Sequence, residues 1–237
     1  WRGRARMTNE IDAEHVESAA REPGRLRTSL LIGLCCLVIY NANLRSISAG
    51  DTYPARYLPF AIVHYHTVYL NPIAKLAAQG RGATAYWLVA RPDGRIMSLY
   101  PLIVPLLVAP LYFPAVAYLH LRGWSETRLD FVARVMEKLS ASFLAAFSVA
   151  LLFLVLRRRT TPKTALLLTL AYAFGTTTWM ISSQALWQHG MAQLLVIGAL
   201  LLLTSRCSVP RTLATGVLLG LVACNRPPDL ILAAALG

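Results

Sequence analysis

The sequence has few charged residues for its length. Only 14% of its 237 residues are Asp, Glu, Lys or Arg, whereas a soluble globular domain carries about 25%. Hydrophobic residues make up 56%, and they gather in runs of about 15 to 22 residues, close to the length that crosses a hydrocarbon core ~30 Å thick. The shortage of charge therefore excludes an ordinary soluble domain and predicts an all-α polytopic membrane protein.

Acidic residues are scarcer than basic ones. There are 11 Asp and Glu against 23 Lys and Arg, a net charge of +12. Basic residues at the ends of spans set membrane orientation and attract anionic lipid. The sequence has no basic face interleaved with aromatic residues, so we expect the lipid bilayer, and no nucleic acid, as a partner.

Cysteine is also sparse. The four cysteines, Cys35, Cys36, Cys207 and Cys224, form no CxxC pair and no Cys/His ligand spacing. This pattern predicts neither a zinc site nor a disulfide. The chain begins at Trp1 and stops at Gly237 within an apolar run, which indicates a fragment truncated at the C-terminus.

The distribution of arginine predicts the orientation. Residues 1–28 read as a cytoplasmic basic tail, and residues 29–237 as the transmembrane module. A first span at about 29–46 leads outward and places Asp51 beyond the membrane. The densest basic cluster, Arg157-Arg158-Arg159, should then be cytoplasmic.

Residues 47–100 are predicted to form the first outer loop. Within it, residues 54–79 are apolar but interrupted by prolines and histidines, which favours helices lying in the interface. Residues 85–100 contain two short β-prone runs around Pro-Asp-Gly, which predicts a β-hairpin. A hairpin has open edges and belongs outside the lipid.

Residues 101–121 allow two interpretations. The segment is apolar enough to span, but it contains Pro101, Pro105, Pro110 and Pro114, and each interior proline costs a helix about 3 kcal/mol. A full crossing would put the triple-arginine cluster outside. We therefore predict a re-entrant or interfacial segment.

The spans that follow alternate in direction. We predict them at residues 131–156, 163–182, 189–204 and 211–224. This topology places Asp51, the loop 182–190 and the loop 225–229 on one outer face.

An ordered set of motifs resembles the polytopic GT-C glycosyltransferases, the class that contains protein O-mannosyltransferases and lipid A aminoarabinose transferases. The motifs are GDTYPARYLPF, PDGRIMSLYP, EKLSASFLAAFSVALLFLVLRRR, ALWQHG and ACNRPPD. The resemblance covers about residues 29–237 and implies a GT-C-like transmembrane bundle. It differs where Leu102-Ile103 follow Tyr-Pro, a place where many relatives have Pro-Gly or Pro-Leu.

The resemblance implies a glycosyltransferase in a bacterial inner (plasma) membrane, with its active face periplasmic or extracellular. A sugar on a polyprenyl phosphate would move to an acceptor glycan, lipid or protein. The acidic residue of the first outer loop maps onto Asp51, which we expect to act as the catalytic base, or as a metal ligand if a divalent ion is used.

Other polar residues are candidates for binding the donor. Phosphate recognition suits Arg56, His189 and Arg226, although Arg56 could instead pair with Asp51 or snorkel. Residues expected to line the substrate are Tyr53, Tyr57, Trp187 and Gln188.

Several charged or titratable residues are left without a single role. Glu137 and Lys138 lie near the outer end of a span and could pair with neighbours or face the site. His64 and His66 are two residues apart and should point to different faces of a helix, which argues against a joint metal site.

Two alternatives remain. The first is a transporter or flippase-like protein for a lipid-linked substrate, but the sequence has no internal repeat and its spans are almost free of mid-span charge. The second is a non-catalytic fragment of the same fold.

Overall fold

The structure is a computed structural model that describes residues 24–43, 45–74 and 86–237. Most of this part of the chain is helical, and the only sheet in it is a two-stranded hairpin. The prediction of a helical protein with a small β-hairpin is therefore confirmed. Outside the described residues lie most of the predicted 1–28 tail, residues 75–79 of the predicted interfacial segment and residue 85 of the predicted hairpin.

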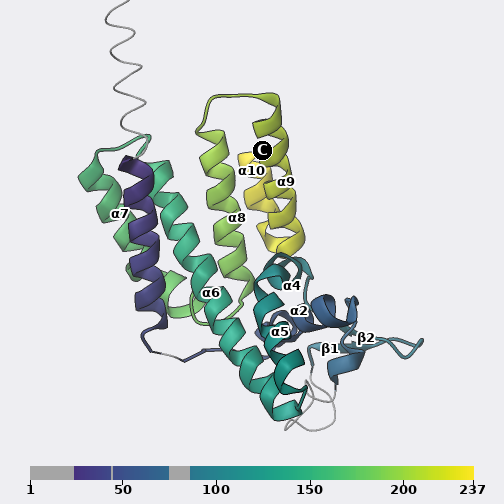
Figure 1. Ribbon diagram of the computed structural model, residues 1–237. Coiled ribbons are helices and arrows are strands. Elements are labelled where there is room, and N and C mark those ends of the chain that lie inside the picture. Colours follow the sequence, from purple (N-terminus) through teal and green to yellow (C-terminus); the bar gives the residue numbers. More distant parts are fainter. Residues whose placement is uncertain (1–23, 44, 75–85) are drawn as a thin grey trace, which may run out of the picture.

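A bundle of helices runs along the long axis of the molecule (Figure 1). It comprises the helix at residues 24–41, α6 (Glu126–Leu156), α7 (Pro162–Gly175), α8 (Gln188–Leu203), α9 (Val209–Asn225) and the short α10 (Leu230–Leu236). In the order of the chain, α6 packs on both α7 and α8, and α8 packs on α9. The first predicted span, 29–46, is thus a helix that ends at residue 41.

The helices of the bundle differ in length. The 31 residues of α6 span about 46 Å. By contrast, α7, α8 and α9 have 14, 16 and 17 residues, or about 21 to 26 Å. The predicted span 163–182 ends early, because α7 stops at Gly175 and a π-helical turn, η4 (Thr178–Ser182), follows. Among the described residues, two helical stretches are long and apolar enough to cross a membrane, Ile103–Arg122 and Glu126–Leu156.

The helix at residues 24–41 packs closely on α6 and α7. A Cβ atom added at Gly33 would lie 3.1 Å from the Cβ atom of Ala150, so the absence of a side chain allows this approach. The Ser29 hydroxyl donates to the carbonyl of Ala150 at 2.8 Å, and the Tyr40 hydroxyl donates to the carbonyl of Ala173 at 3.0 Å. These contacts hold the first helix along nearly its whole length.

Basic side chains from distant parts of the chain meet at one end of the bundle. Arg25, Arg157 and Lys163 line one pocket there. Arg158 donates to two hydroxyl groups just after α8, at 2.9 and 2.8 Å. We call this the arginine end, and the opposite end the site end. The start of the first helix and the end of α6 therefore lie at the same end, as the arginine distribution predicted.

Residues 103–122 do not form one regular helix. The segment divides into α4 (Ile103–Val108), a 3-10 turn η3 (Ala109–Tyr112) and α5 (Phe113–Arg122). Figure 1 shows these pieces away from the arginine end, with α5 beside the N-terminal part of α6 and α4 against α2 and α9. Although its length and composition would permit a crossing, the segment does not run from one end of the bundle to the other.

The helix α2 (Tyr53–Tyr65) is more deeply buried than an interfacial helix should be. Every residue from Pro54 to Ala61 is buried, whereas an interfacial helix presents one face to lipid and another to water. Large side chains explain the difference: Phe60 packs edge-to-face on the fully buried Tyr112, with ring centroids 5.0 Å apart. The site end thus has a core of its own.

The predicted hairpin is present. Strands β1 (Leu88–Ala90) and β2 (Ile96–Ser98) pair antiparallel, with Val89 opposite Met97. Gly94 has φ 78°, a left-handed conformation that glycine adopts without strain. The Asp93 carboxylate accepts the backbone N–H of Arg95 at 3.0 Å, so Asp93 has the structural role expected of a turn residue.

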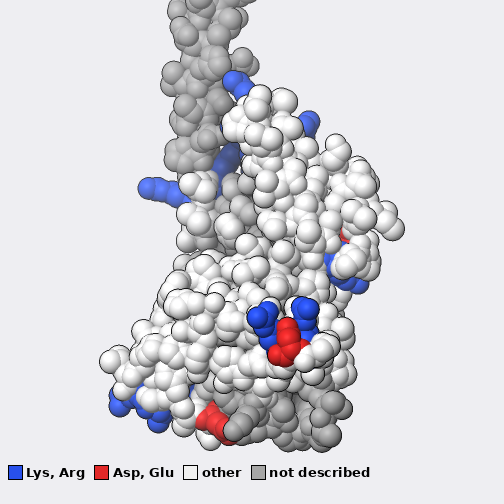
Figure 2. Space-filling view, turned by 90° about the vertical axis from the view of Figure 1, so that its right-hand side faces the viewer, with Lys and Arg blue, Asp and Glu red and all other residues white. Residues whose placement is uncertain are grey.

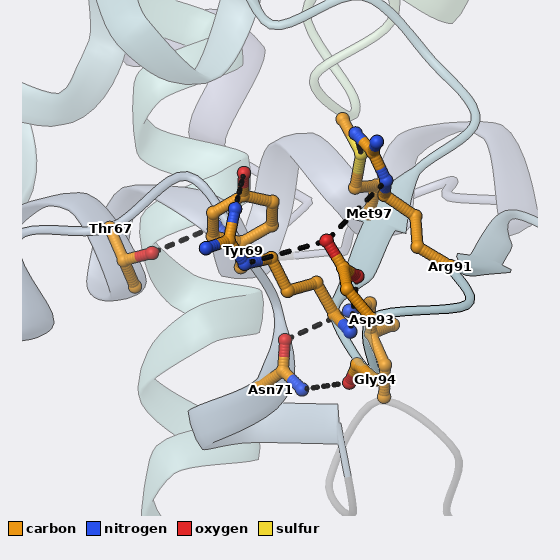
Figure 3. A network of polar contacts seen from close by, with 9 residues as sticks. Thr67, Tyr69, Asn71, Arg91, Asp93, Gly94 and Met97 are labelled. Atoms are coloured by element: carbon orange, nitrogen blue, oxygen red, sulfur yellow. Dashed lines mark hydrogen bonds and ion pairs between the residues drawn. The ribbon is translucent and has the colours of Figure 1, made fainter.

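Figure 3 shows how the hairpin is attached to the preceding loop. The Asn71 side chain donates to the carbonyl of Gly94 at 2.9 Å and accepts the N–H of Ile96 at 2.8 Å. Arg95 lies over the ring of Tyr69, at 4.9 Å, and donates to its hydroxyl at 2.9 Å. On the side of the molecule that carries the hairpin, charged side chains are few, and most of the surface above the hairpin is uncharged (Figure 2).

Candidate functional site

The carboxylate of Asp51 lies at the base of the hairpin. Asp51 belongs to a short 3-10 turn, η1 (Gly50–Thr52), and its Oδ1 atom accepts hydrogen bonds from the hydroxyls of Tyr86 at 2.5 Å and Tyr100 at 2.6 Å. These tyrosines flank the two strands, and the strand register, extended by two residues, places one opposite the other. The hairpin therefore carries both phenols to the same acid.

These phenols keep Asp51 ionised. The hydrogen bond from Tyr100, then that from Tyr86, and the nearby charge of His189 lower the pKa of Asp51, while partial burial opposes them. Burial and the hydrogen bond to Asp51 raise the pKa of Tyr100, so the phenol stays protonated and continues to donate. At neutral pH the site therefore contains a carboxylate.

Gly50 allows Tyr86 to reach Asp51. A Cβ atom at position 50 would lie 2.6 Å from Cζ and 2.7 Å from Cε1 of Tyr86 and would meet its hydroxyl as well. Any larger residue would force the Tyr86 ring away. A glycine next to the acid is therefore part of how the site is built.

A cavity of about 410 Å³ lies at the same end of the molecule; Asp51 is not part of its lining but interacts electrostatically with His189, which is. Its lining combines apolar helix faces with a small polar group: Thr177, Ile181, His189, Ala192, Gln193, Val196, Arg226, Asp229 and Leu232. The predicted residues His189 and Arg226 thus share one cavity. Arg226 uses Nη1 to pair with Asp229 at 3.1 Å, which leaves its other guanidinium nitrogens for another acceptor.

Hydrogen bonds between two loops bring Asp51 and the cavity together. The N–H of Ile47 donates to the carbonyl of Gln184 at 3.3 Å, and the indole N–H of Trp187 donates to the carbonyl of Ile47 at 3.3 Å. The Trp187 ring also stacks beside His189, with centroids 6.4 Å apart. The segment leading to Asp51 is thereby fixed against the start of α8.

Gln188 and Asn225 join α8 to α9 at the same level. The backbone carbonyl of Gln188 accepts the Asn225 side-chain amide at 2.9 Å. This bond places His189, at the start of α8, beside Arg226, which follows α9. The three residues that carried the functional prediction, Asp51, His189 and Arg226, therefore lie at one end of the molecule and close together.

Arg56 has a different environment. Its guanidinium is buried and pairs with Glu137, with Nε 2.7 Å and Nη2 2.6 Å from Oε2. It also donates to the Ser48 hydroxyl and lies over the Tyr53 ring, 4.6 Å from its centroid. The sequence suggested Asp51 as a possible partner of Arg56; the structure shows Glu137 instead. These contacts hold Arg56 in the packed interior of the protein, outside the lining of the cavity.

The two predicted tyrosines are part of the same packing. Tyr53 packs edge-to-face on the buried Trp87 at 5.8 Å. Tyr57 is buried and donates to Asp130 Oδ1 at 2.7 Å. Neither ring lines the cavity that contains His189 and Arg226. Both tyrosines therefore belong to the packed interior of the site end.

Glu137 and Lys138 are functional positions that sequence patterns left open. While Glu137 pairs with Arg56, the buried Lys138 ammonium donates to the carbonyl of Ser183 at 3.1 Å and to Oε1 of Gln184 at 2.7 Å. Both therefore support the site without lining its cavity. In the sequence, the signal that could have identified them was the presence of two adjacent charged residues inside an apolar helix.

His64, His66 and His120 belong to aromatic packing and to a helix end in the described part of the chain. Within the described ranges, no three His, Cys, Asp or Glu side chains gather closely enough to hold an ion. His64 stacks on Trp124 at 4.1 Å, and its ring lies 4.6 Å from that of His120. His66 ends α2 in a left-handed conformation, φ 52°.

Comparisons with protein-family models, with curated proteins and with solved structures gave no match for this chain.

Removing one phenol should change the acid stability of the protein. Tyr100→Phe deletes a donor to Asp51, so the folded-state pKa of Asp51 should rise toward its unfolded value of about 3.9. A carboxylate whose pKa is lower in the folded than in the unfolded protein stabilises the folded state at pH values above its unfolded pKa. This stabilisation is lost as the pH falls through the folded-state pKa. We expect the variant to be about 1 kcal/mol less stable at pH 7, with the difference shrinking below about pH 4. Melting curves in detergent across this range measure it.

The control is the same change in an Asp51→Asn background, where the pH dependence of the difference should vanish. Parallel curves for the wild type and Tyr100→Phe down to the lowest pH would contradict the assignment.

Breaking the buried ion pair should be far more costly than breaking an exposed one. Glu137→Ala leaves the Arg56 guanidinium buried and unpaired, and should lower the free energy of unfolding by about 3 to 5 kcal/mol. Arg134 pairs with Asp130 at 2.6 Å on the same helix but is 62% exposed, so Arg134→Ala should cost less than about 1 kcal/mol. Equal losses of thermal stability would show that the Arg56–Glu137 pair is not buried.

Proposed function

We propose that this chain is an integral-membrane glycosyltransferase of the GT-C type, which transfers a sugar from a polyprenyl-phosphate donor to an acceptor. The reaction takes place at the site end, which we assign to the periplasmic or extracellular side of a bacterial plasma membrane. The observation that carries the proposal is that His189, which lines a cavity together with Arg226, lies near enough to the Asp51 carboxylate to interact with it electrostatically. The ordered motifs of the sequence support it.

The reaction needs a base and a place for the leaving phosphate. An acceptor hydroxyl loses its proton to the Asp51 carboxylate as its oxygen attacks C1 of the sugar. A bond forms between that oxygen and C1, and the bond between C1 and the phosphate oxygen breaks. The polyprenyl phosphate leaves with the electron pair, and fixed cations stabilise its charge.

The cavity has the size and chemistry for the donor head group. Its volume of about 410 Å³ falls within the roughly 300 to 1,000 Å³ of small-molecule sites. Arg226 supplies a guanidinium held by Asp229 at one nitrogen only, and His189 supplies an imidazole that can donate to a phosphate oxygen. The carboxylate of Asp229 offsets part of the positive charge, which favours release of the spent carrier.

The apolar walls suit the lipid part of such a donor. Ile181 and Leu232 both line the cavity and are exposed, Leu232 by 44%. A prenyl chain could therefore extend from the cavity along the bundle, while its phosphate stays beside Arg226. A water-soluble donor such as a sugar nucleotide would gain nothing from these walls.

The catalytic role of Asp51 predicts loss of turnover in Asp51→Asn, which keeps the size and hydrogen-bond acceptor of the side chain but cannot take a proton. Purified protein in liposomes would receive radiolabelled polyprenyl-phosphate mannose or pentose, and label leaving the lipid extract would be counted. We expect at least a hundredfold loss of transfer. Asp93→Asn, at the hairpin tip, is the matched control and should transfer at the wild-type rate.

Transfer by Asp51→Asn at the wild-type rate would remove the acid from the mechanism. The same liposomes separate a transferase from a flippase-like transporter, because a transporter changes the sidedness of the labelled lipid without breaking its sugar–phosphate bond.

The binding role of Arg226 predicts weaker association with the carrier. Arg226→Lys keeps the charge but loses the planar, bidentate geometry, and we expect affinity for labelled polyprenyl phosphate to fall about tenfold. Arg91→Lys on the hairpin, outside the cavity, should bind as the wild type does. Unchanged affinity in Arg226→Lys would show that the phosphate is held elsewhere.

A further inference from the structure

A second pocket lies at the arginine end, far from the site already described. Its volume is about 470 Å³, and its lining comes from the first helix, the end of α6 and the start of α7: Gly24, Arg25, Thr28, Phe153, Arg157, Pro162, Lys163 and Leu166. No step of the proposed transfer reaction uses this pocket, and its chemistry differs from that of the first cavity.

Three cations converge on the pocket, and none of them pairs with an anion within the described residues. Arg25, Arg157 and Lys163 come from three different helical segments. Among the described residues, no carboxylate lies within ion-pair distance of any of them. Concentrating three like charges around one space is unfavourable unless an anion occupies it.

One of these cations has an unsatisfied donor. Arg25 Nε is buried and has no hydrogen-bond partner in the described part of the chain. Arg157 uses Nη1 to donate to the carbonyl of Thr160 at 2.9 Å, which holds the guanidinium at the pocket. Buried donors of this kind are normally satisfied, so an acceptor group belongs in this space.

The pocket also has an apolar side. Phe153 is buried beneath it, and Leu166 at its edge is 40% exposed. The two helices that frame the pocket continue away from it with further exposed leucines: Leu30 and Leu31 on the first helix, and Leu167 and Leu170 on α7. A ligand with a charged head and an apolar tail matches this arrangement, and a small soluble anion does not.

We propose that this pocket binds the head group of an anionic phospholipid, such as phosphatidylglycerol. The phosphodiester lies among Arg25, Arg157 and Lys163, where it accepts the Arg25 donor, and the acyl chains follow the exposed leucines. Such a lipid neutralises the three cations and joins the first helix to α6 and α7. The proposal is independent of the transferase assignment, because none of these residues lies near Asp51 or its cavity.

Native mass spectrometry of the purified full chain in a neutral detergent tests this site. The probes are dioctanoyl phosphatidylglycerol, dioctanoyl phosphatidylcholine and inorganic phosphate. The variant is the double change Arg25→Gln with Lys163→Gln. The matched control is Arg159→Gln with Arg206→Gln, which removes the same charge from exposed residues outside the pocket.

The wild type should bind phosphatidylglycerol at least tenfold more tightly than phosphatidylcholine. The pocket variant should lose about 25-fold in affinity, because each basic residue contributes about fivefold near an anionic lipid. The control should stay within about twofold. Equal losses in both variants would show only general surface attraction and overturn the site, as would the absence of a preference for phosphatidylglycerol.

Inorganic phosphate distinguishes a lipid site from a simple anion site. Millimolar phosphate should not displace the lipid, because it cannot replace the contacts of the acyl chains. Full displacement would overturn the lipid assignment. Melting curves of both variants without lipid check folding, and a pocket variant that melts like the control keeps the binding comparison valid.

Discussion

The buried ammonium group of Lys138 joins segments of the chain that are far apart in sequence. It donates to the carbonyl of Ser183 and to the side chain of Gln184, and the same Gln184 oxygen accepts the amide of Asn43 at 3.2 Å. The backbone carbonyl of Gln184 then accepts Ile47. One cation in the middle of α6 thus fixes both the loop that leads to Asp51 and the loop that leads to His189. It acts together with the hydrogen bonds that join Ile47 to Gln184 and Trp187.

Glu137, the preceding residue on α6, holds the other half of the site end. Adjacent helix positions point about 100° apart, so Glu137 reaches Arg56 on α2 while Lys138 reaches the loop at Ser183. The pair is an anchor between α2 and α6, which also meet through the hydrogen bond from Tyr57 to Asp130 and through apolar contacts. Buried charges are expensive to place, and here each is matched by partners on a different segment. The geometry of the site end therefore depends on a few electrostatic contacts inside an apolar molecule.

The sequence predicted those features that depend on local chemistry. Pro92-Asp93-Gly94 indicated the hairpin, the prolines of 101–121 indicated a broken segment, and the arginines at 157–159 indicated which ends lie together. The pairing of Arg56 with Glu137, 81 residues apart, could not be predicted, because no local pattern says which buried charges meet. The deep burial of α2 was missed for the same reason. Tyr86 and Tyr100 could have been found, since they lie at equal distances from the hairpin turn.

The grouping of Asp51, His189 and Arg226 on one face followed from counting crossings, and the geometry agrees with it. Counting the membrane crossings could not predict the cavity, because the shape of the cavity depends on where α7 stops and on the π-helical turn that follows. Among its other polar members, Gln193 belongs to no motif, and Asp229 ends the motif ACNRPPD without any sign there that it pairs with Arg226. They became visible only when α8 and the segment after α9 were placed side by side.

The unequal helix lengths have a consequence for the surrounding lipid. Beside α6 a bilayer meets a long apolar column, but beside α7, α8 and α9 it meets helices shorter than its own hydrocarbon thickness. Lipids next to such short helices compress to avoid exposing their chains to water. The resulting thinning would bring phosphate groups inward on the flank that carries Arg226, so that the carrier lipid of the proposed reaction would reach the guanidinium by lateral diffusion within the membrane.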